Sequence, residues 1–367
     1  MHTYKIEAMV AGLLMCTLFA CSSAGKVKGK PRANYSTAIT QLEDSLGGGH
    51  LGVYVETADG TVVAAHNARR YFVPASNTKL LSLYAGLKYL PDSLPGLRYH
   101  DAGDTIFALP TGDPTLLEDD FKLQPVVTWL QSLKKPLVIA APNWKAERYG
   151  RGWTWSDYQA GYQPERSAMP VYGNRPPVMV TTRKVFADGN SVQLALEVSL
   201  GPAGAGKRRL NPEAVNWEVN PGARFSITRA YSGNAFTVRY SGLHDTTINT
   251  RIPLVTNGIA LATAVMRNLA NGTRDTLDIT ELADHPFFNH TGKARFSTLN
   301  SQPLDSMLQV MMYRSDNLYA EQTLLMASNE FLGYMSDRDM IDTLIKTDFK
   351  AMPDKPVWAD GSGLSRY

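Results

Sequence analysis

The chain has 367 residues, of which 44% are hydrophobic and 19% are charged, and this composition excludes a disordered or fibrous protein. Its formal net charge of +3 is too small to indicate a nucleic-acid partner. The two cysteines, Cys16 and Cys21, both lie at the extreme N-terminus, so the body of the chain has neither a disulfide nor a reactive thiol.

The first 20 residues have the pattern of a secretory signal peptide. Lys5 provides a basic start, and the apolar run at residues 9–20 is too short to span a bilayer, which takes about 20 apolar residues. Residues 18–21, Leu-Phe-Ala-Cys, resemble a bacterial lipobox, in which the cysteine becomes lipidated. We therefore expect an exported, periplasmic protein that is anchored to a membrane through a lipid on Cys21 and a flexible tether at residues 21–33. The alternative is an ordinary signal peptide that is cleaved nearby.

Residues 34–90 carry two helical patterns with a hairpin between them. Two apolar runs flank a turn at residues 58–60, which predicts the hairpin. Apolar residues recur at helical spacing on either side of it. The expected elements are a helix at 36–46, strands at 51–55 and 61–65, and a helix at 76–87.

From residue 91 to residue 285 the character of the sequence changes, because prolines, glycines and short alternating runs dominate. We interpret this stretch as a β-rich insertion, and helical patterns return over residues 286–367. The predicted fold class is α+β, a sheet flanked by helices that is interrupted by the insertion. The clearest elements are strands at 192–198, 224–228 and 235–240 and helices at 257–269, 303–312, 318–327 and 339–346.

Ser76 and Lys79 form a Ser-x-x-Lys motif at the start of a predicted helix. Residues three apart on a helix lie on the same face, so a lysine in this place can accept the serine's proton if burial lowers its pKa. Backbone N–H groups at the start of the helix favour a developing oxyanion. The alternative is that Ser76 is a plain N-cap, because the motif occurs by chance in most proteins.

Ser315, Asp316 and Asn317 form a second motif between two predicted helices. A polar triplet in that place can simply be a turn with a helix cap. However, Ser-x-x-Lys followed by Ser-x-Asn is the order found in penicillin-interacting enzymes, which the chain resembles in this respect. The resemblance implies that Ser315 relays protons between the lysine and the leaving group. It also implies that the amide of Asn317 orients the lysine and binds a substrate carbonyl.

Four longer stretches extend the resemblance in the same order along the chain. They are Pro-Ala-Ser-Asn-Thr-Lys at 74–79, Gly-Asp-Pro-Thr-Leu at 112–116, Gly-Arg-Gly-Trp-Thr-Trp-Ser-Asp at 150–157 and Asp-Gly-Ser-Gly-Leu-Ser-Arg at 360–366. Together with the two motifs they resemble the D-alanyl-D-alanine carboxypeptidase/endopeptidase family, the low-molecular-mass class C penicillin-binding proteins, over residues 35–367. The wide gap between Lys79 and Ser315 is similar to that of this family, whose members carry large inserted domains there.

The resemblance implies a transpeptidase domain of the penicillin-binding-protein and β-lactamase type. Ser76 would attack the carbonyl of a peptidoglycan stem that ends in D-Ala-D-Ala, and Lys79 would take its proton. Water would then hydrolyse the acyl-enzyme, β-lactams would be covalent inhibitors, and no metal or organic cofactor would be needed. Two alternatives stay open: another acyl-serine enzyme, such as a β-lactamase or esterase, and a non-catalytic lipoprotein that binds the cell wall.

The same resemblance suggests a substrate-binding role for Trp153, Asp157 and Arg366. Related enzymes use these segments to hold the free end of a diaminopimelate-type side chain. Ser156 departs from the pattern, since many relatives have an acidic residue there. The alternatives are core packing for Trp153 and a surface ion pair for Arg366.

The family's third motif, Lys-Thr-Gly or a close variant, does not occur after Asn317 in this sequence. In relatives it binds the terminal carboxylate of the substrate, and its strand supplies the second donor of the oxyanion hole. Loss of one such donor costs about 100- to 1000-fold in rate. We therefore expect the chain as written to be truncated in its second peptidase segment, to fold poorly and to have little activity.

Two other patterns are interpreted without a function. Residues 201–207 begin like a phosphate-binding loop, but Arg208 stands where a Ser or Thr would hold the metal, so a loop between strands is expected. The seven histidines form no zinc-binding pattern, and no metal site is expected. The predicted organisation is a signal peptide at 1–20, a tether at 21–33, peptidase segments at 34–90 and 286–367, and the insertion at 91–285.

Overall fold

The computed structural model describes residues 35–182, 195–200, 208–210, 214–270, 279–281, 286–289, 296–354 and 356–366. The expected signal peptide, the tether with Cys21 and the glycine-rich loop at 201–207 lie outside the described residues. The chain divides into two compact units, one that ends at Phe72 and one that begins at Val73. The predicted boundaries of the insertion, at 91 and 285, stay predictions.

The first unit consists of one helix and one hairpin. The helix α2 (Tyr35–Ser45) precedes the antiparallel strands β1 (Val53–Glu56) and β2 (Val62–His66), so both predicted elements are confirmed. Glu43 Oε2 in α2 lies 2.6 Å from His66 Nε2 at the end of β2. This contact ties the helix to the hairpin, since an isolated two-stranded hairpin is marginally stable at best in water.

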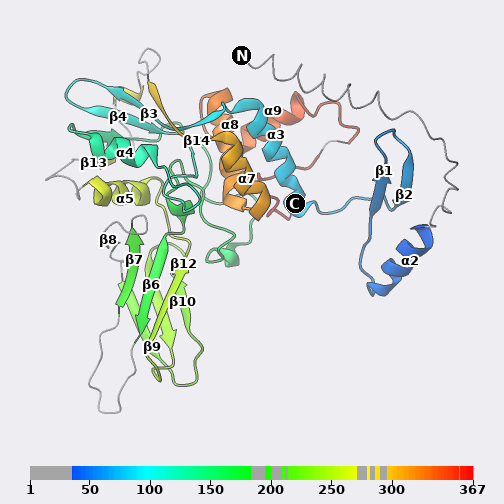
Figure 1. Ribbon diagram of the computed structural model, residues 1–367, viewed down its shortest axis with the longest axis horizontal. Helices are drawn as coiled ribbons and strands as arrows, with labels where there is room; N and C mark the ends of the chain where they lie inside the picture. The colour runs from blue at the N-terminus through cyan, green and yellow to red at the C-terminus, as the bar shows by residue number, and fades with distance from the viewer. Residues whose placement is uncertain are drawn as a thin grey trace, which may run out of the picture. The chain divides into compact units, whose positions relative to one another are not determined.

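In the second unit, α8 is the central helix, and its residues from 318 to 329 are buried. Close packing needs Gly86 in the neighbouring helix, because a Cβ there would lie 2.7 Å from Thr323 Cγ2. Three helices lie side by side with α8 (Figure 1). The four are α3 (Lys79–Tyr89), α7 (Leu304–Arg314), α8 (Asn317–Leu332) and α9 (Asp337–Lys346).

A five-stranded mixed sheet joins four strands of the expected insertion, at 91–285, to one strand that follows it. β3 pairs antiparallel with β14, with Leu97 opposite Leu299. The helices α4 (Pro125–Ser132) and α5 (Ala260–Ala270) pack together over this sheet, and Leu130, Leu137 and Val265 lie in its core. The strand order is β13 (Ile279–Glu281), β5 (Leu137–Ile139), β4 (Ile106–Pro110), β3 (Ser93–Asp101) and β14 (Ser297–Pro303).

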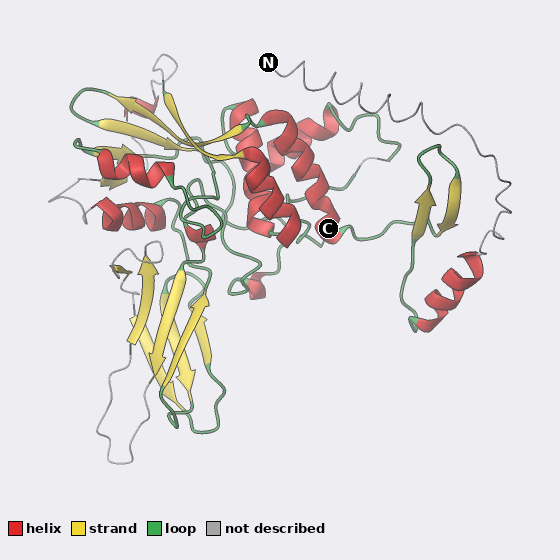
Figure 2. Ribbon diagram, in the orientation of Figure 1, coloured by secondary structure: helices red, strands yellow, loops and turns green. Residues whose placement is uncertain are grey.

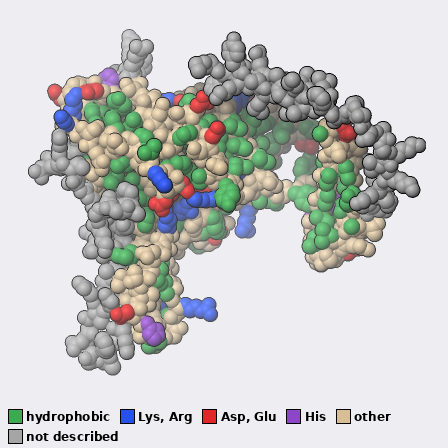
Figure 3. All heavy atoms as spheres, in the orientation of Figure 1, with side chains coloured by type: hydrophobic (Ala, Val, Ile, Leu, Met, Phe, Trp, Pro, Cys, Tyr) green, Lys and Arg blue, Asp and Glu red, His purple; other side chains and the backbone are tan. Residues whose placement is uncertain are grey.

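Two smaller sheets make the middle of the chain β-rich, and Figure 2 shows them apart from the helices. On the face of the second unit that Figure 3 draws, basic and acidic side chains lie next to one another rather than in patches of one sign. The four-stranded sheet has the order β12 (Thr246–Arg251), β6 (Pro177–Thr182), β7 (Ala195–Leu200) and β8 (Arg208–Leu210). The three-stranded sheet has the order β10 (Ser226–Arg229), β11 (Ala235–Tyr240) and β9 (Ala214–Val219), and the short helix α6 (Pro286–Asn289) follows later.

The predicted helices and strands are confirmed in type where they are described, with shifts at their ends; residues 192–194 of the strand expected at 192–198 lie outside the described residues. The exception is the start of the helix expected at 76–87, where Ala75–Thr78 form a 3-10 turn and the α-helix begins only at Lys79. The pair β3 and β14 was not predicted, because Pro95 and Gly96 obscure the strand pattern. Within the described part of the chain, no helix is long and apolar enough to cross a membrane.

Candidate active site

Ser76 lies in the tight 3-10 turn that precedes α3. Ala75 has a φ of +46°, which is uncommon for a residue with a side chain. Ser76 is exposed, whereas Thr78 and Lys79 are buried. The turn therefore presents a serine hydroxyl to solvent directly beside a buried amine.

The Lys79 ammonium is only 1% exposed and makes three hydrogen bonds. It donates to Ser76 Oγ at 3.0 Å, to Asn317 Oδ1 at 2.6 Å and to the Ser362 carbonyl oxygen at 3.0 Å. An ammonium has three donors and no acceptor, so this set accounts for all of them. The amine thus joins three segments that are far apart in the sequence.

Burial lowers the pKa of Lys79 below its usual value of 10.5, because the charged form loses its hydration. The carboxylates of Glu321, Asp316 and Asp360 oppose this effect and favour the charged form. At a given pH, a larger fraction of Lys79 is therefore neutral than of a free lysine. When neutral, it can take a proton from the hydroxyl that it contacts.

The segment around Asp360 lies beside Lys79 and is held by several hydrogen bonds. Asp360 accepts hydrogen bonds from the backbone N–H groups of Gly363 and Ser365, at 2.8 and 2.7 Å, and from Trp153 Nε1 at 2.8 Å. Ser82 of α3 donates to the Gly361 carbonyl at 2.6 Å. These bonds fix the turn that supplies an acceptor to Lys79.

A buried ion cluster lies behind this turn. Glu321 accepts from the Ser362 N–H at 2.8 Å and from Arg166 at 3.0 Å, and Arg166 also donates to Asp337 at 2.8 Å. Burial raises the pKa of Glu321 to about 7, although Arg166 favours its charged form. Glu321 is four residues after Asn317, so one face of α8 presents both side chains toward the Lys79 region.

The two predicted motifs meet only in part. Ser76, Lys79 and Asn317 come together, and Asn317 Nδ2 donates to the Tyr162 carbonyl at 2.9 Å. Ser315 ends α7 with a φ of +54° and is exposed. Among the described residues, no hydrogen bond of its hydroxyl is found, and its role as a proton relay stays a prediction.

The three residues suggested for substrate binding lie in different surroundings. Trp153 is half-buried and bonded to Asp360, so it also serves the packing alternative. Asp157 accepts from the Tyr162 hydroxyl at 2.7 Å. The hydrogen bond to Asp157 raises the pKa of Tyr162, and the charge of Arg366, which is exposed, opposes this shift.

Sequence reasoning missed Tyr162, Arg166 and Glu321. Their partners are distant in the chain, and none of them belongs to a recognisable spacing. The motif at Gly112–Leu116 also contacts α8, because the carbonyl oxygen of Gly112 accepts a hydrogen bond from Gln322 at 2.7 Å. Within the described ranges, no group of three or more acidic, His or Cys side chains is arranged to hold a metal.

Residues 32–367 match the model of the D-Ala-D-Ala carboxypeptidase 3 (S13) family. The chain belongs to this family. The match confirms the family and the α+β fold class expected from the motifs. No curated protein matched the sequence as a relative.

Two solved structures have the same fold. Penicillin binding protein 4 (dacB) from Haemophilus influenzae superposes with a TM-score of 0.65 at 19% identity, over 89% of this chain and 74% of the other. The same protein in complex with a novel β-lactam gives a TM-score of 0.61 at 17% identity, over 89% and 73%.

The Asp360 turn yields a stability prediction. Gly363 has a φ of +79°, and a Cβ there would lie 1.9 Å from the Ala75 carbonyl oxygen. We expect Gly363→Ala to lower the free energy of unfolding by more than the ~1–2 kcal/mol of the left-handed backbone alone, because the turn must also move away from Ala75. Urea denaturation measures the loss.

Gly103→Ala is the matched control. Gly103 has a φ of +96° but no atom within 4 Å of the position of its Cβ, so it carries only the backbone cost. Equal losses in the two variants would show that Gly363 does not depend on its contact with Ala75.

Proposed function

We propose that the protein is a serine-type D-Ala-D-Ala carboxypeptidase/endopeptidase that acts on peptidoglycan peptide stems through an acyl-enzyme on Ser76. The observation that carries the proposal is the buried Lys79 ammonium, whose three hydrogen bonds end on Ser76, Asn317 and the Ser362 carbonyl. Membership of the S13 family gives the reaction class.

In the proposed reaction, Ser76 Oγ attacks the carbonyl carbon between the two D-alanines while its proton passes to neutral Lys79. As the bond to the terminal D-alanine breaks, Ser315 donates its hydroxyl proton to the leaving amine and takes up the proton held by Lys79. Water then attacks the ester, releases the shortened stem and regenerates the Ser76 hydroxyl. The exposed position of Ser315, two residues before Asn317, allows its hydroxyl to turn toward the substrate.

Asn317 has a fixed orientation that suits the proposed role. Its carbonyl oxygen accepts from Lys79, so its amide NH₂ points away and donates one proton to Tyr162. An amide nitrogen carries two protons, and the second is available for a substrate carbonyl. Near Tyr162, Asp157 and Arg366 offer one negative and one positive group for a zwitterionic side-chain end.

The alternatives differ in chemistry. A non-catalytic wall-binding protein gives no reason to bury an amine against an exposed serine, since such burial opposes the charged state. A β-lactamase or esterase needs a dedicated base that activates water for deacylation. The second structural relative was solved with a β-lactam bound, and we propose that β-lactams likewise acylate Ser76 in this chain.

Covalent labelling tests the nucleophile. We expect labelled penicillin to attach to the purified protein, to attach equally to Ser132→Ala, and to fail with Ser76→Ala. Ser132 bonds only to the Trp129 carbonyl among the described residues and lies outside the site. Undiminished labelling of Ser76→Ala would refute the assignment, and rapid release of the label would favour a β-lactamase. The absolute rate of labelling tests the expectation of low activity, which follows from the absence of a Lys-Thr-Gly motif after Asn317 in this sequence.

The state of Lys79 predicts the pH dependence of acylation. The reactive form is the neutral amine, so the rate should rise with pH through the pKa of Lys79. Because burial lowers that pKa, the midpoint should lie below 10.5. Labelling rates from pH 5 to 10 measure it. A rate that does not change with pH while the protein stays folded would contradict Lys79 as the base.

Export and lipidation are also proposed, on the strength of the sequence around Cys21. In bacterial cells, Cys21→Ser should abolish incorporation of a labelled fatty acid and release the protein from the membrane fraction. Retention of the label in Cys21→Ser would exclude this anchor.

A further inference from the structure

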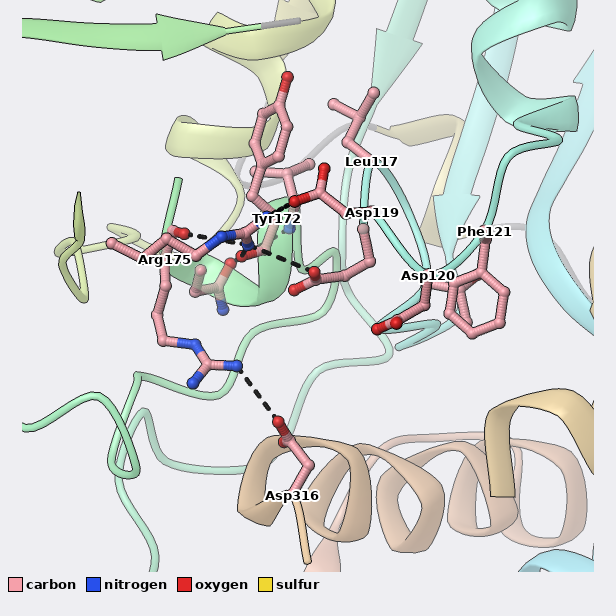
Figure 4. Close-up of polar contacts among 12 residues, drawn as sticks. Leu117, Asp119, Asp120, Phe121, Tyr172, Arg175 and Asp316 are labelled. Carbon is pink, nitrogen blue, oxygen red and sulfur yellow. Dashed lines mark hydrogen bonds and ion pairs between the residues drawn. The ribbon is translucent and has the colours of Figure 1, made fainter. Parts of the chain in front are cut away.

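The loop that carries Ser315 and Asn317 is held from one side by Arg175. One guanidinium nitrogen of Arg175 donates to Asp316 Oδ2 at 3.2 Å, and another donates to the Gly161 carbonyl at 2.6 Å. Figure 4 shows Arg175 pointing from its own loop toward Asp316 at the start of α8. Gly161 directly precedes Tyr162, whose carbonyl holds Asn317. Arg175 therefore links the two loops that meet at the Asn317 amide.

The three residues directly before Arg175 have an uncommon backbone conformation. Tyr172, Gly173 and Asn174 are all left-handed, with φ of 53°, 58° and 55°. Each non-glycine residue in this conformation costs roughly 1–2 kcal/mol, so it persists only where its surroundings hold it. Asn174 Nδ2 does so by donating to the Glu165 carbonyl at 2.7 Å and to Ser167 Oγ at 3.1 Å.

The neighbouring acidic side chains have other cationic partners. Arg251 pairs with Glu118 at 3.3 Å and with Asp119 at 2.5 Å, and Arg314 pairs with Asp120. Burial raises the pKa of Glu118, which is 7% exposed, while the charge of Arg251 and then that of Arg175 oppose this shift. Among the described ion pairs, the one that involves Asp316 is its pair with Arg175.

Asp316 is a charged neighbour of the lysine as well as a helix cap. It accepts from the Tyr319 N–H at 3.1 Å and so caps α8. Three carboxylates face Lys79, namely Asp316 from the cap of α8, Glu321 from α8 and Asp360 from the C-terminal turn. Each is held from another side, Asp316 by Arg175, Glu321 by Arg166, and Asp360 by Trp153 and backbone N–H groups.

We propose that Arg175 is a positioning residue of the reaction, which fixes Asp316, and through it Asn317, against Lys79 and offsets the negative charge of Asp316. This inference rests on the proposed function, in which Lys79 must be neutral to act. Without Arg175, the uncompensated charge of Asp316 would hold the proton on Lys79 more strongly, so acylation would need a higher pH. Glu118 also faces Asp316, and its negative charge would add to the effect.

The test measures the rate of Ser76 acylation by labelled penicillin as a function of pH in a set of folded variants. In Arg175→Met the rising limb should move to higher pH by about half a unit to one unit, which lowers the rate on that limb by about 3- to 10-fold. Arg175→Lys keeps a cation at this position, so its rising limb should lie close to that of the wild-type protein. Asp316→Asn keeps a capping side chain and should move the limb to lower pH. The double variant Arg175→Met with Asp316→Asn should therefore lack the alkaline shift.

Arg98→Met is the matched control, since Arg98 forms a comparable half-buried pair with Glu330 at 2.6 Å away from the loop. It should leave the midpoint unchanged. A folded Arg175→Met with the wild-type midpoint, or a shift that neither Arg175→Lys nor the double variant reverses, would overturn the inference. If Arg175→Met does not fold, the test rests on Asp316→Asn. A rising limb at the wild-type pH in Asp316→Asn would then overturn the inference. Labelling that survives Ser76→Ala would instead refute the proposed function.

Discussion

A buried ammonium that needs three acceptors is the constraint around which the second unit is arranged. A charge without partners in the interior costs far more than any single contact gains, so Lys79 can be buried only if each of its donors is met. Ser76 lies one helical turn away, but Asn317 and Ser362 come from segments more than two hundred residues later. The packing of α3 on α8 and the turn at Asp360 are therefore conditions for a buried lysine, and the site assembles only when the unit folds.

The same constraint accounts for the charged residues that surround Lys79 and its hydrogen-bond partners. Carboxylates that surround an amine stabilise its cation, and they oppose the effect of burial on the pKa of Lys79. Glu321 is held by Arg166, which is itself buried and also paired with Asp337. Such a cluster contributes little net stability, because desolvation offsets its attraction. What it provides is a fixed Ser362 N–H and carbonyl, and so a fixed acceptor for the lysine.

Sequence alone could predict that Ser76, Lys79 and Asn317 share one candidate site, because they belong to short motifs with recognisable spacings. It could also give the element types, since the apolar periods of α8 and β11 are clear. It could not find Arg166, Glu321 or Arg175, whose partners lie on other segments and obey no local pattern. The strand β3 was hidden for a different reason, because its pairing with β14 depends on a long-range contact that outweighs the weak propensity of Pro95 and Gly96.

The predicted insertion is part of the site rather than an attachment to it. Trp153 bonds to the Asp360 turn, the Tyr162 carbonyl holds the Asn317 amide, and Arg175 holds Asp316. All three come from residues 91–285, yet each contacts a segment that follows that range. In the same way, β3 near the start of that range pairs with β14 beyond its end, and the Gly112 carbonyl accepts a hydrogen bond from Gln322 of α8. Changes in the insertion should thus act on the orientation of Asn317 and on the proton affinity of Lys79, not only on the binding of substrate.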